Sequence, residues 1–151
     1  MRPSDRVLAL AGCGAALATL VPVALYQSGL IPVLPDPPGK VFDSERITSS
    51  RTAHPLGVPD SYLGLASYGV TLSLLLLARR SRRAQALLAA KLAVDAGAAG
   101  FNAVRQVATF GKLCSWCTGT ALATAVMVYG ARSALTGAAG LAMERTDKLA
   151  G

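Results

Sequence analysis

Two cysteines in the last third of the chain carry its clearest chemistry. Cys114 and Cys117 are separated by Ser115 and Trp116, and a run without charged residues continues from Cys114 to Gly130. At the start of a helix this spacing places both thiols in the first turn, where free N–H groups and the helix dipole favour the reactive thiolate. The pair therefore predicts thiol–disulfide exchange. We expect Cys114 to be the exposed thiol that meets partner proteins, with Cys117 one turn deeper and facing the bundle interior.

The same spacing also occurs in other kinds of site. A structural zinc site needs four ligands, and only Cys13 and His54 remain to join the pair. Covalent haem attachment needs a histidine directly after the second cysteine, where this chain has Thr118. Two buried small residues without chemistry are a further interpretation. We favour redox chemistry and expect no metal site.

The composition is that of a membrane protein. Hydrophobic residues make up 52% of the 151 residues and charged residues 15%, whereas soluble domains carry about 25% charged residues. The formal net charge of +7 is compatible with nucleic-acid binding, but most basic residues lie between or beside apolar runs. Charges in such places set membrane orientation rather than bind phosphates. We therefore expect the lipid bilayer, and no nucleic acid, as a partner.

Four segments approach the length of about 20 apolar residues that crosses the hydrocarbon core. The predicted spans cover residues 7–30, 61–78, 84–110 and 113–131. They predict an all-α membrane protein, a four-helix transmembrane bundle with a long outer loop at 31–60 between spans one and two. The membrane domain would cover 1–136, and 137–151 would form a cytoplasmic tail.

The basic residues predict the orientation of these spans. Nine flank one side of the predicted membrane: Arg2, Arg6, Arg79, Arg80, Arg82, Arg83, Arg132, Arg145 and Lys148. Four flank the other: Lys40, Arg46, Arg51 and Lys112. Because basic loops remain in the cytoplasm, we expect a multi-pass protein of a bacterial-type inner membrane with both termini cytoplasmic. The cysteine pair would then face the outer compartment, where disulfides persist.

The predicted outer loop is the longest polar segment. Residues 43–52 can form a short helix, and Asp60 and Ser61 suit the N-cap of span two. A solvated connector and a cap over a binding pocket are both compatible with this pattern.

Span three contains charged residues within an apolar helix. Lys91 and Asp95 are four residues apart on one face, and Arg105 lies nearer the outer end. Pairing reduces the cost of placing charges in a membrane. We favour a structural ion pair. A proton path or a support for a pocket is the functional alternative, and a small transporter is a further possibility that rests on these charges alone.

Two segments resemble the vitamin K epoxide reductase family. They are LCSWCT at 113–118, which leads the last span, and GVPDSYLG at 57–64, which enters the second. The order of elements agrees as well: span, long outer loop, span, basic turn, span, short turn and C-x-x-C span. The resemblance covers about residues 7–134.

The resemblance implies a four-helix bundle around a quinone of the ubiquinone or menaquinone type, in a quinone-linked thiol oxidoreductase. Cys117 would exchange electrons with the quinone, and Cys114 with another cysteine pair. Asp60 and Ser61 match positions that contribute to the quinone pocket, and Tyr68 matches an aromatic position farther along the same span. Family members often have asparagine at the position of Asp60.

One departure from the family bears on the mechanism. The family usually carries two more cysteines in the outer loop, whereas residues 41–50 here contain none, and Ser49 lies near the second expected position. Electrons would then come from a separate thioredoxin-like or other thiol protein in the outer compartment. The alternative is a non-catalytic membrane protein of the same fold that binds a quinone or a partner.

Overall fold

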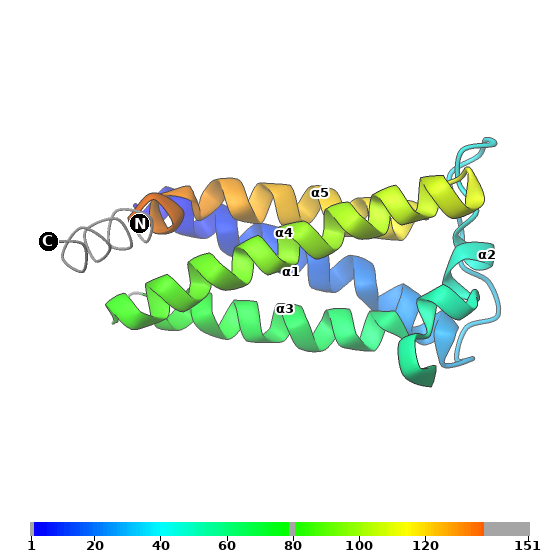
Figure 1. Cartoon of the computed structure of the whole chain (residues 1–151), viewed down its shortest axis with the longest axis horizontal. Coiled ribbons are helices and arrows are strands. Elements are labelled where there is room, and N and C mark those ends of the chain that lie inside the picture. Colours follow the sequence, from blue (N-terminus) through cyan, green and yellow to red (C-terminus); the bar gives the residue numbers. More distant parts are fainter. Residues whose placement is uncertain (1, 79–80, 138–151) are drawn as a thin grey trace, which may run out of the picture.

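Four long helices form an elongated bundle in the computed structural model, which describes residues 2–78 and 81–137 (Figure 1). They are α1 (Pro3–Gln27), α3 (Asp60–Leu77), α4 (Arg82–Phe110) and α5 (Ser115–Gly130). Helix α1 packs against α5 and α3, and α4 also packs against both. The described residues contain no strand, only one isolated bridge between Phe42 and Leu113. The predicted all-α class is confirmed.

The four helices correspond to the four predicted spans, with ends that differ by a few residues. Helices α1, α3 and α4 are long and apolar enough to cross a membrane, which identifies the chain as an integral membrane protein. Helix α5 has 16 residues, a length of about 24 Å, and it is not among these candidates. A fourth crossing therefore stays a prediction.

The contact between α1 and α5 brings the two backbones together. A Cβ atom added to Gly12 of α1 would lie 2.6 Å from the backbone nitrogen of Met127 in α5. A Cβ atom added to Gly130 of α5 would lie 2.5 Å from the backbone nitrogen of Ala9 in α1. Small residues allow such close approach, which strengthens helix packing in lipid. We call this contact the α1–α5 seam.

Helix α4 has clear signals at both ends. The Ser81 hydroxyl accepts a hydrogen bond from the backbone N–H of Ala84 at 3.4 Å and caps the start of the helix. Gly111 ends the helix in the left-handed region with φ of 64°, which glycine adopts without steric cost. The predicted short turn follows, and the chain enters α5 at Cys114.

The connecting segment (residues 28–59) joins α1 to α3. It contains the short helix α2 (Ser44–Thr48) and two single-turn 3₁₀ helices, η1 (Arg51–Ala53) and η2 (Pro55–Gly57). Helix α2 confirms the short helix predicted within 43–52. Figure 1 shows α2 at the end of the bundle opposite the N-terminus.

Backbone pairing fixes the connecting segment to the turn before α5. The N–H of Leu113 donates to the carbonyl of Val41 at 3.0 Å, and the N–H of Asp43 donates to the carbonyl of Leu113 at 2.9 Å. Lys112 and Asp43 form an ion pair at 3.3 Å beside these bonds. The segment is therefore joined directly to the residue that precedes the cysteine pair.

The predicted N-cap role of Asp60 and Ser61 is wrong. Pro59 occupies the N-cap position of α3 and makes no side-chain cap hydrogen bond. The two side chains bond to Gln27 of α1 instead: Gln27 Nε2 donates to Asp60 Oδ1 at 3.0 Å, and Ser61 Oγ donates to Gln27 Oε1 at 2.5 Å. The two side chains therefore bond to another helix instead of capping the first turn of α3.

Some predictions lie outside the described residues. These include residues 138–151 of the predicted tail and four of the basic residues used for orientation, namely Arg79, Arg80, Arg145 and Lys148.

Candidate functional site

The two cysteines occupy the first turn of α5, as the sequence predicts. Cys114 is the N-cap residue, and its Sγ accepts a hydrogen bond from the backbone N–H of Cys117 at 3.1 Å. All three cysteines of the chain lie within the described part and carry free thiols. An N–H donor at a helix start stabilises a thiolate. The arrangement therefore suits a reactive cysteine pair in its reduced form.

The expectation that Cys114 is the exposed thiol is wrong. Its exposed fraction is 0%, whereas Cys117 is partly exposed. Cys114 is buried because α4 and the connecting segment both pack over the start of α5. On the α4 side, Gln106 accepts a hydrogen bond from the backbone N–H of Cys114 at 2.8 Å. Gln106 lies eight residues before Cys114 and in a different helix, so spacing within one helix does not predict this contact.

Three polar residues hold the connecting segment against α5, and we call them the Asp36 latch: Asp36, Ser44 and Ser115. Asp36 accepts hydrogen bonds from the hydroxyls of Ser44 at 2.5 Å and Ser115 at 2.6 Å, and from the backbone N–H of Ser44 at 2.7 Å. The backbone N–H of Ser115 donates to Ser44 Oγ at 2.9 Å. Next to the latch, Trp116 Nε1 donates to the carbonyl of Pro35 at 2.9 Å. The latch closes the connecting segment over Cys114.

The latch also fixes the charge state of its carboxylate. Partial burial raises the pKa of Asp36, but the hydrogen bonds donated by Ser115 and Ser44 outweigh burial and leave the pKa below its ordinary value. Asp36 is therefore ionised at neutral pH. Its contribution to stability is present above the ordinary carboxylate pKa and is lost as the pH falls through the lowered value.

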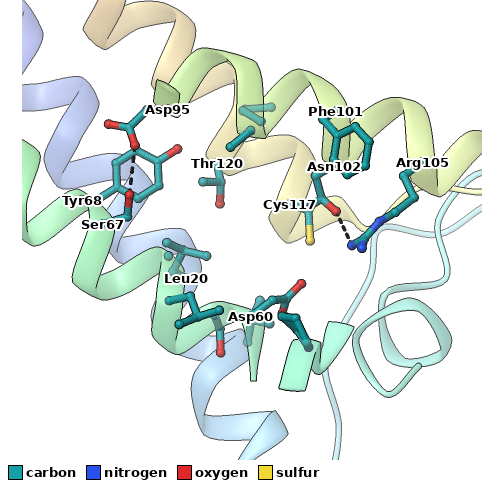
Figure 2. A pocket seen from close by; sticks show the side chains of 18 residues that line it. Leu20, Asp60, Ser67, Tyr68, Asp95, Phe101, Asn102, Arg105, Cys117 and Thr120 are labelled. Atoms are coloured by element: carbon teal, nitrogen blue, oxygen red, sulfur yellow. Dashed lines mark hydrogen bonds between the residues drawn. The ribbon is translucent and has the colours of Figure 1, made fainter. Parts of the chain in front are cut away.

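A cavity of about 410 Å³ lies between the four helices beside Cys117 (Figure 2). Four residues that the sequence analysis singled out line it: Cys117, Asp60, Ser61 and Tyr68. Most of the remaining wall is apolar and includes Leu20, Val23, Leu63, Ala98, Ala99 and Phe101. Cys114 is not among the lining residues. The two thiols therefore have different surroundings, one against the connecting segment and one against the cavity.

Helix α4 supplies polar groups near the mouth of the cavity. Arg105 and Asn102 both line it, and Arg105 donates to Asn102 Oδ1 at 2.9 Å. Arg105 also donates to the carbonyl of Thr52 in the connecting segment at 2.9 Å. Figure 2 shows the Arg105–Asn102 bond on the Cys117 side of the cavity. No role for Asn102 or Arg105 was predicted from the sequence.

A second set of polar side chains lies in the part of the cavity away from Arg105. The predicted ion pair between Lys91 and Asp95 is confirmed. Asp95 and Ser67 line the cavity, and Ser67 Oγ donates to Asp95 Oδ1 at 3.1 Å. The sequence analysis missed Ser67. The signal was available, since Asp60, Gly64 and Ser67 recur at helical spacing and all three face the cavity.

Cys13 is separate from the cysteine pair. Its side chain is fully buried, and its Sγ donates to the backbone carbonyl of Tyr68 at 3.5 Å. It lies in the apolar core with Ala9, Ala16 and Met127. Its placement is that of a core residue.

Comparison with known protein families places most of the chain in one family. The model of the vitamin K epoxide reductase family matches residues 6–131, a range that includes both cysteines of the pair and the whole cavity lining. No curated protein and no solved structure matches the chain.

Proposed function

Because the chain belongs to the vitamin K epoxide reductase family, we propose that it is a membrane thiol–disulfide oxidoreductase that passes electrons between a partner thiol protein and a quinone. The electrons would pass through the Cys114–Cys117 pair. The position of Cys117 supports this most directly, because its side chain lies in the wall of the cavity. Cys114 lies one turn earlier, against the connecting segment. Such a pair can react with a small molecule at the cavity and, once the connecting segment moves away from the buried Cys114, with a protein on the other side.

The cavity suits a quinone head group. Ligand pockets of about 300–1,000 Å³ are mostly apolar with a few convergent polar groups, and the cavity of about 410 Å³ fits this description. Asp60 and Ser61 supply polar groups from α3, and Tyr68 supplies an aromatic ring farther along that helix. We assign these three residues to quinone binding, with a quinone of the ubiquinone or menaquinone type.

The thiol half-reaction starts from the oxidised pair. Cys114 is buried under the connecting segment, so the reaction requires this segment to move away from the start of α5. A thiolate of the partner then attacks Cys114 Sγ in the Cys114–Cys117 disulfide, and Cys117 leaves as a thiolate. The second thiolate of the partner then attacks the mixed disulfide and releases Cys114. The partner leaves as a disulfide, and two electrons remain on the cysteine pair. Residues 41–50 contain no cysteine, so the partner is a separate thioredoxin-like or other thiol protein of the outer compartment.

The quinone half-reaction returns the pair to its oxidised form. Cys117 gives up electrons at the cavity, and Cys114 Sγ closes the disulfide with Cys117. The two thiols together lose two electrons and two protons, and the quinone becomes the quinol by gaining the same number of each. The protein supplies orientation and a mostly apolar pocket, and the quinone carries the electrons into the membrane.

We further propose that α5 is the fourth crossing. The α1–α5 seam pairs Gly12 with Met127 and Ala9 with Gly130, so α5 runs along α1 back toward the N-terminal end of the bundle. Both termini of a bacterial-type inner-membrane protein would then be cytoplasmic, with the connecting segment outside. The distribution of basic residues supports the same orientation.

The direct test uses purified protein in lipid nanodiscs with a short-chain quinone and a dithiol substrate. The wild-type protein should oxidise the dithiol and reduce the quinone, and Cys117→Ala and Cys114→Ala should each abolish turnover. Cys13→Ala is the matched control, because its thiol lies in the core away from the cavity, and it should keep wild-type turnover. Full activity of Cys117→Ala would overturn the mechanism.

Trapping in native membranes separates this proposal from the non-catalytic alternative. Cys117→Ala leaves Cys114 without its resolving thiol, so a partner that attacks it should remain attached as a mixed disulfide. If no such adduct forms, a membrane protein that binds a quinone or a partner without exchange becomes the better description.

A further inference from the structure

Four side chains form a buried polar cluster in the middle of the bundle: Lys91, Asp95, Ser67 and Thr71. Lys91 and Asp95 form an ion pair within α4, and their side chains are 18% and 3% exposed. Asp95 lies about 20 Å along α4 from its start at Arg82. Ionisable groups at this depth in a membrane are costly and usually serve a function.

The hydrogen bonds show where protons are held in this cluster. Asp95 is the shared acceptor of the cluster: it accepts from Lys91, from Ser67 at 3.1 Å and from Thr71 at 2.6 Å. Lys91 Nζ also donates to Ser67 Oγ at 2.8 Å. The Lys91 ammonium is thus the proton-rich group, and the Ser67 hydroxyl is its direct neighbour.

The two hydroxyls of the cluster differ in what they face. Ser67 lines the cavity together with Asp95, whereas Thr71 is fully buried and is not among the lining residues. Figure 2 shows Ser67 and Asp95 bonded to each other at the part of the cavity away from Arg105. Ser67 therefore connects the Lys91 ammonium to the cavity.

The other nearby groups that carry a proton are committed elsewhere. Thr124 donates its hydroxyl proton to the carbonyl of Thr120 at 2.7 Å, so at its 2.6 Å contact with Tyr68 it accepts the Tyr68 proton. The Cys13 thiol donates to the carbonyl of Tyr68. Residues 115–130 of α5 include no charged residue.

We propose that Lys91 and Ser67 form a proton relay to the quinone, with Asp95 holding the two donors in place; this rests on the proposed function. As the cysteine pair supplies two electrons, the Ser67 hydroxyl turns from Asp95 toward the cavity, its O–H bond breaks and its proton goes to a quinone carbonyl oxygen. An N–H bond of Lys91 breaks to restore the Ser67 hydroxyl, and the resulting amine regains a proton from water. The second quinol proton comes from one thiol of the pair, and the proton of the other thiol leaves to water.

Two substitutions separate a relay from a structural ion pair. Lys91→Arg keeps the positive charge beside Asp95, but a guanidinium does not release a proton in a protein. Ser67→Ala removes the hydroxyl that faces the cavity. Thr71→Val is the matched control, because it also removes one hydrogen bond to Asp95 and keeps the side-chain shape, but it leaves the cavity wall intact.

The experiment mixes pre-reduced protein in nanodiscs with a short-chain quinone and follows quinone absorbance in a single turnover. Quinone affinity and the rate of reduction by dithiothreitol are measured on the same samples, and the wild-type rate is repeated in deuterated water. Ser67→Ala and Lys91→Arg should slow quinone reduction about 100-fold, a typical contribution of general acid catalysis. Both should keep the quinone affinity and the rate of reduction by dithiothreitol. Thr71→Val should stay within about twofold of wild type, and the wild-type rate should fall in deuterated water.

The outcomes are distinguishable. Wild-type rates in both Ser67→Ala and Lys91→Arg would overturn the relay and leave the proposed function standing. An equal loss in Thr71→Val and Ser67→Ala would show that the cluster is structural and would overturn the relay as well. A wild-type protein that reduces no quinone while its thiols are intact would overturn the proposed function, and the relay with it.

Discussion

The two sides of α5 differ in how closely they approach their neighbours. On the α1 side the backbones touch, because Gly12 and Gly130 leave no room even for a Cβ atom. On the other side Cys117 and Thr120 line the cavity, so this part of α5 is open to a small molecule. A rigid contact on one side of a helix and a cavity on the other keep a reactive thiol fixed while leaving room for a small molecule.

Stability and chemistry depend on different surfaces of α5, the α1–α5 seam and the cavity wall. The α1–α5 seam consists of small apolar residues and resembles other close helix contacts in membranes. The cavity wall carries polar groups, such as Asp60, Asn102 and Arg105. Substitutions at the seam should therefore act on folding, and substitutions at the cavity should act on the reaction.

The largest effect is expected at the seam. Gly12→Val would drive the new side chain into the backbone of Met127, 2.6 Å from the position of its Cβ. The expected loss is about 3 kcal/mol of folding free energy, the upper part of the usual range for overpacking. Thermal unfolding in detergent, followed by circular dichroism, measures this effect.

Gly14→Val is the control for that experiment, since a Cβ at Gly14 meets no atom within 4 Å. Both variants place a valine in the same helix, so the difference between them isolates the contact from helix propensity. Equal unfolding temperatures for the two variants would show that the helices do not approach as closely as described.

A smaller effect is expected on the cavity side. Ala99→Leu would add bulk to the cavity wall and should weaken quinone affinity about tenfold, or about 1.4 kcal/mol. Ala96→Leu is the control, because Ala96 is exposed on the same helix and is not among the lining residues. Quinone titration of the purified variants measures the affinity. A change in unfolding temperature without a change in affinity would contradict the assignment of this side to ligand binding.

The sequence predicted features within one helix better than contacts between separate segments. The helices, the position of the cysteine pair and the Lys91–Asp95 pair followed from hydrophobic runs and from spacing within one helix. The contacts of Gln106 and Ser115 depend on how separate segments meet, and local spacing holds no information about that. Cys114 was expected to be exposed for the same reason, since the residues that cover it come from 34–44 and from α4.

The Asp36 latch is a third kind of contact on α5, and it differs from the seam by being polar. The backbone contacts at Gly12 and Gly130 involve no titrating side chain, whereas the latch depends on one carboxylate with three hydrogen bonds. Because these bonds hold the pKa of Asp36 below its ordinary value, the latch is stable above about pH 4, the ordinary aspartate pKa. It loses stability as the pH falls through the lowered pKa.

Trp116 reports on this latch and gives the smallest of the expected effects. It is the single tryptophan of the chain, and its Nε1 donates to the carbonyl of Pro35, next to Asp36. Protonation of Asp36 should loosen the contact between residues 35–36 and α5 and shift the Trp116 emission below pH 4, while the circular dichroism of the bundle stays unchanged. Asp36→Asn should show the shifted emission already at neutral pH and no acid transition. If this variant keeps the wild-type acid transition, a group other than Asp36 causes that transition. The contact over Cys114 would then not depend on the Asp36 carboxylate.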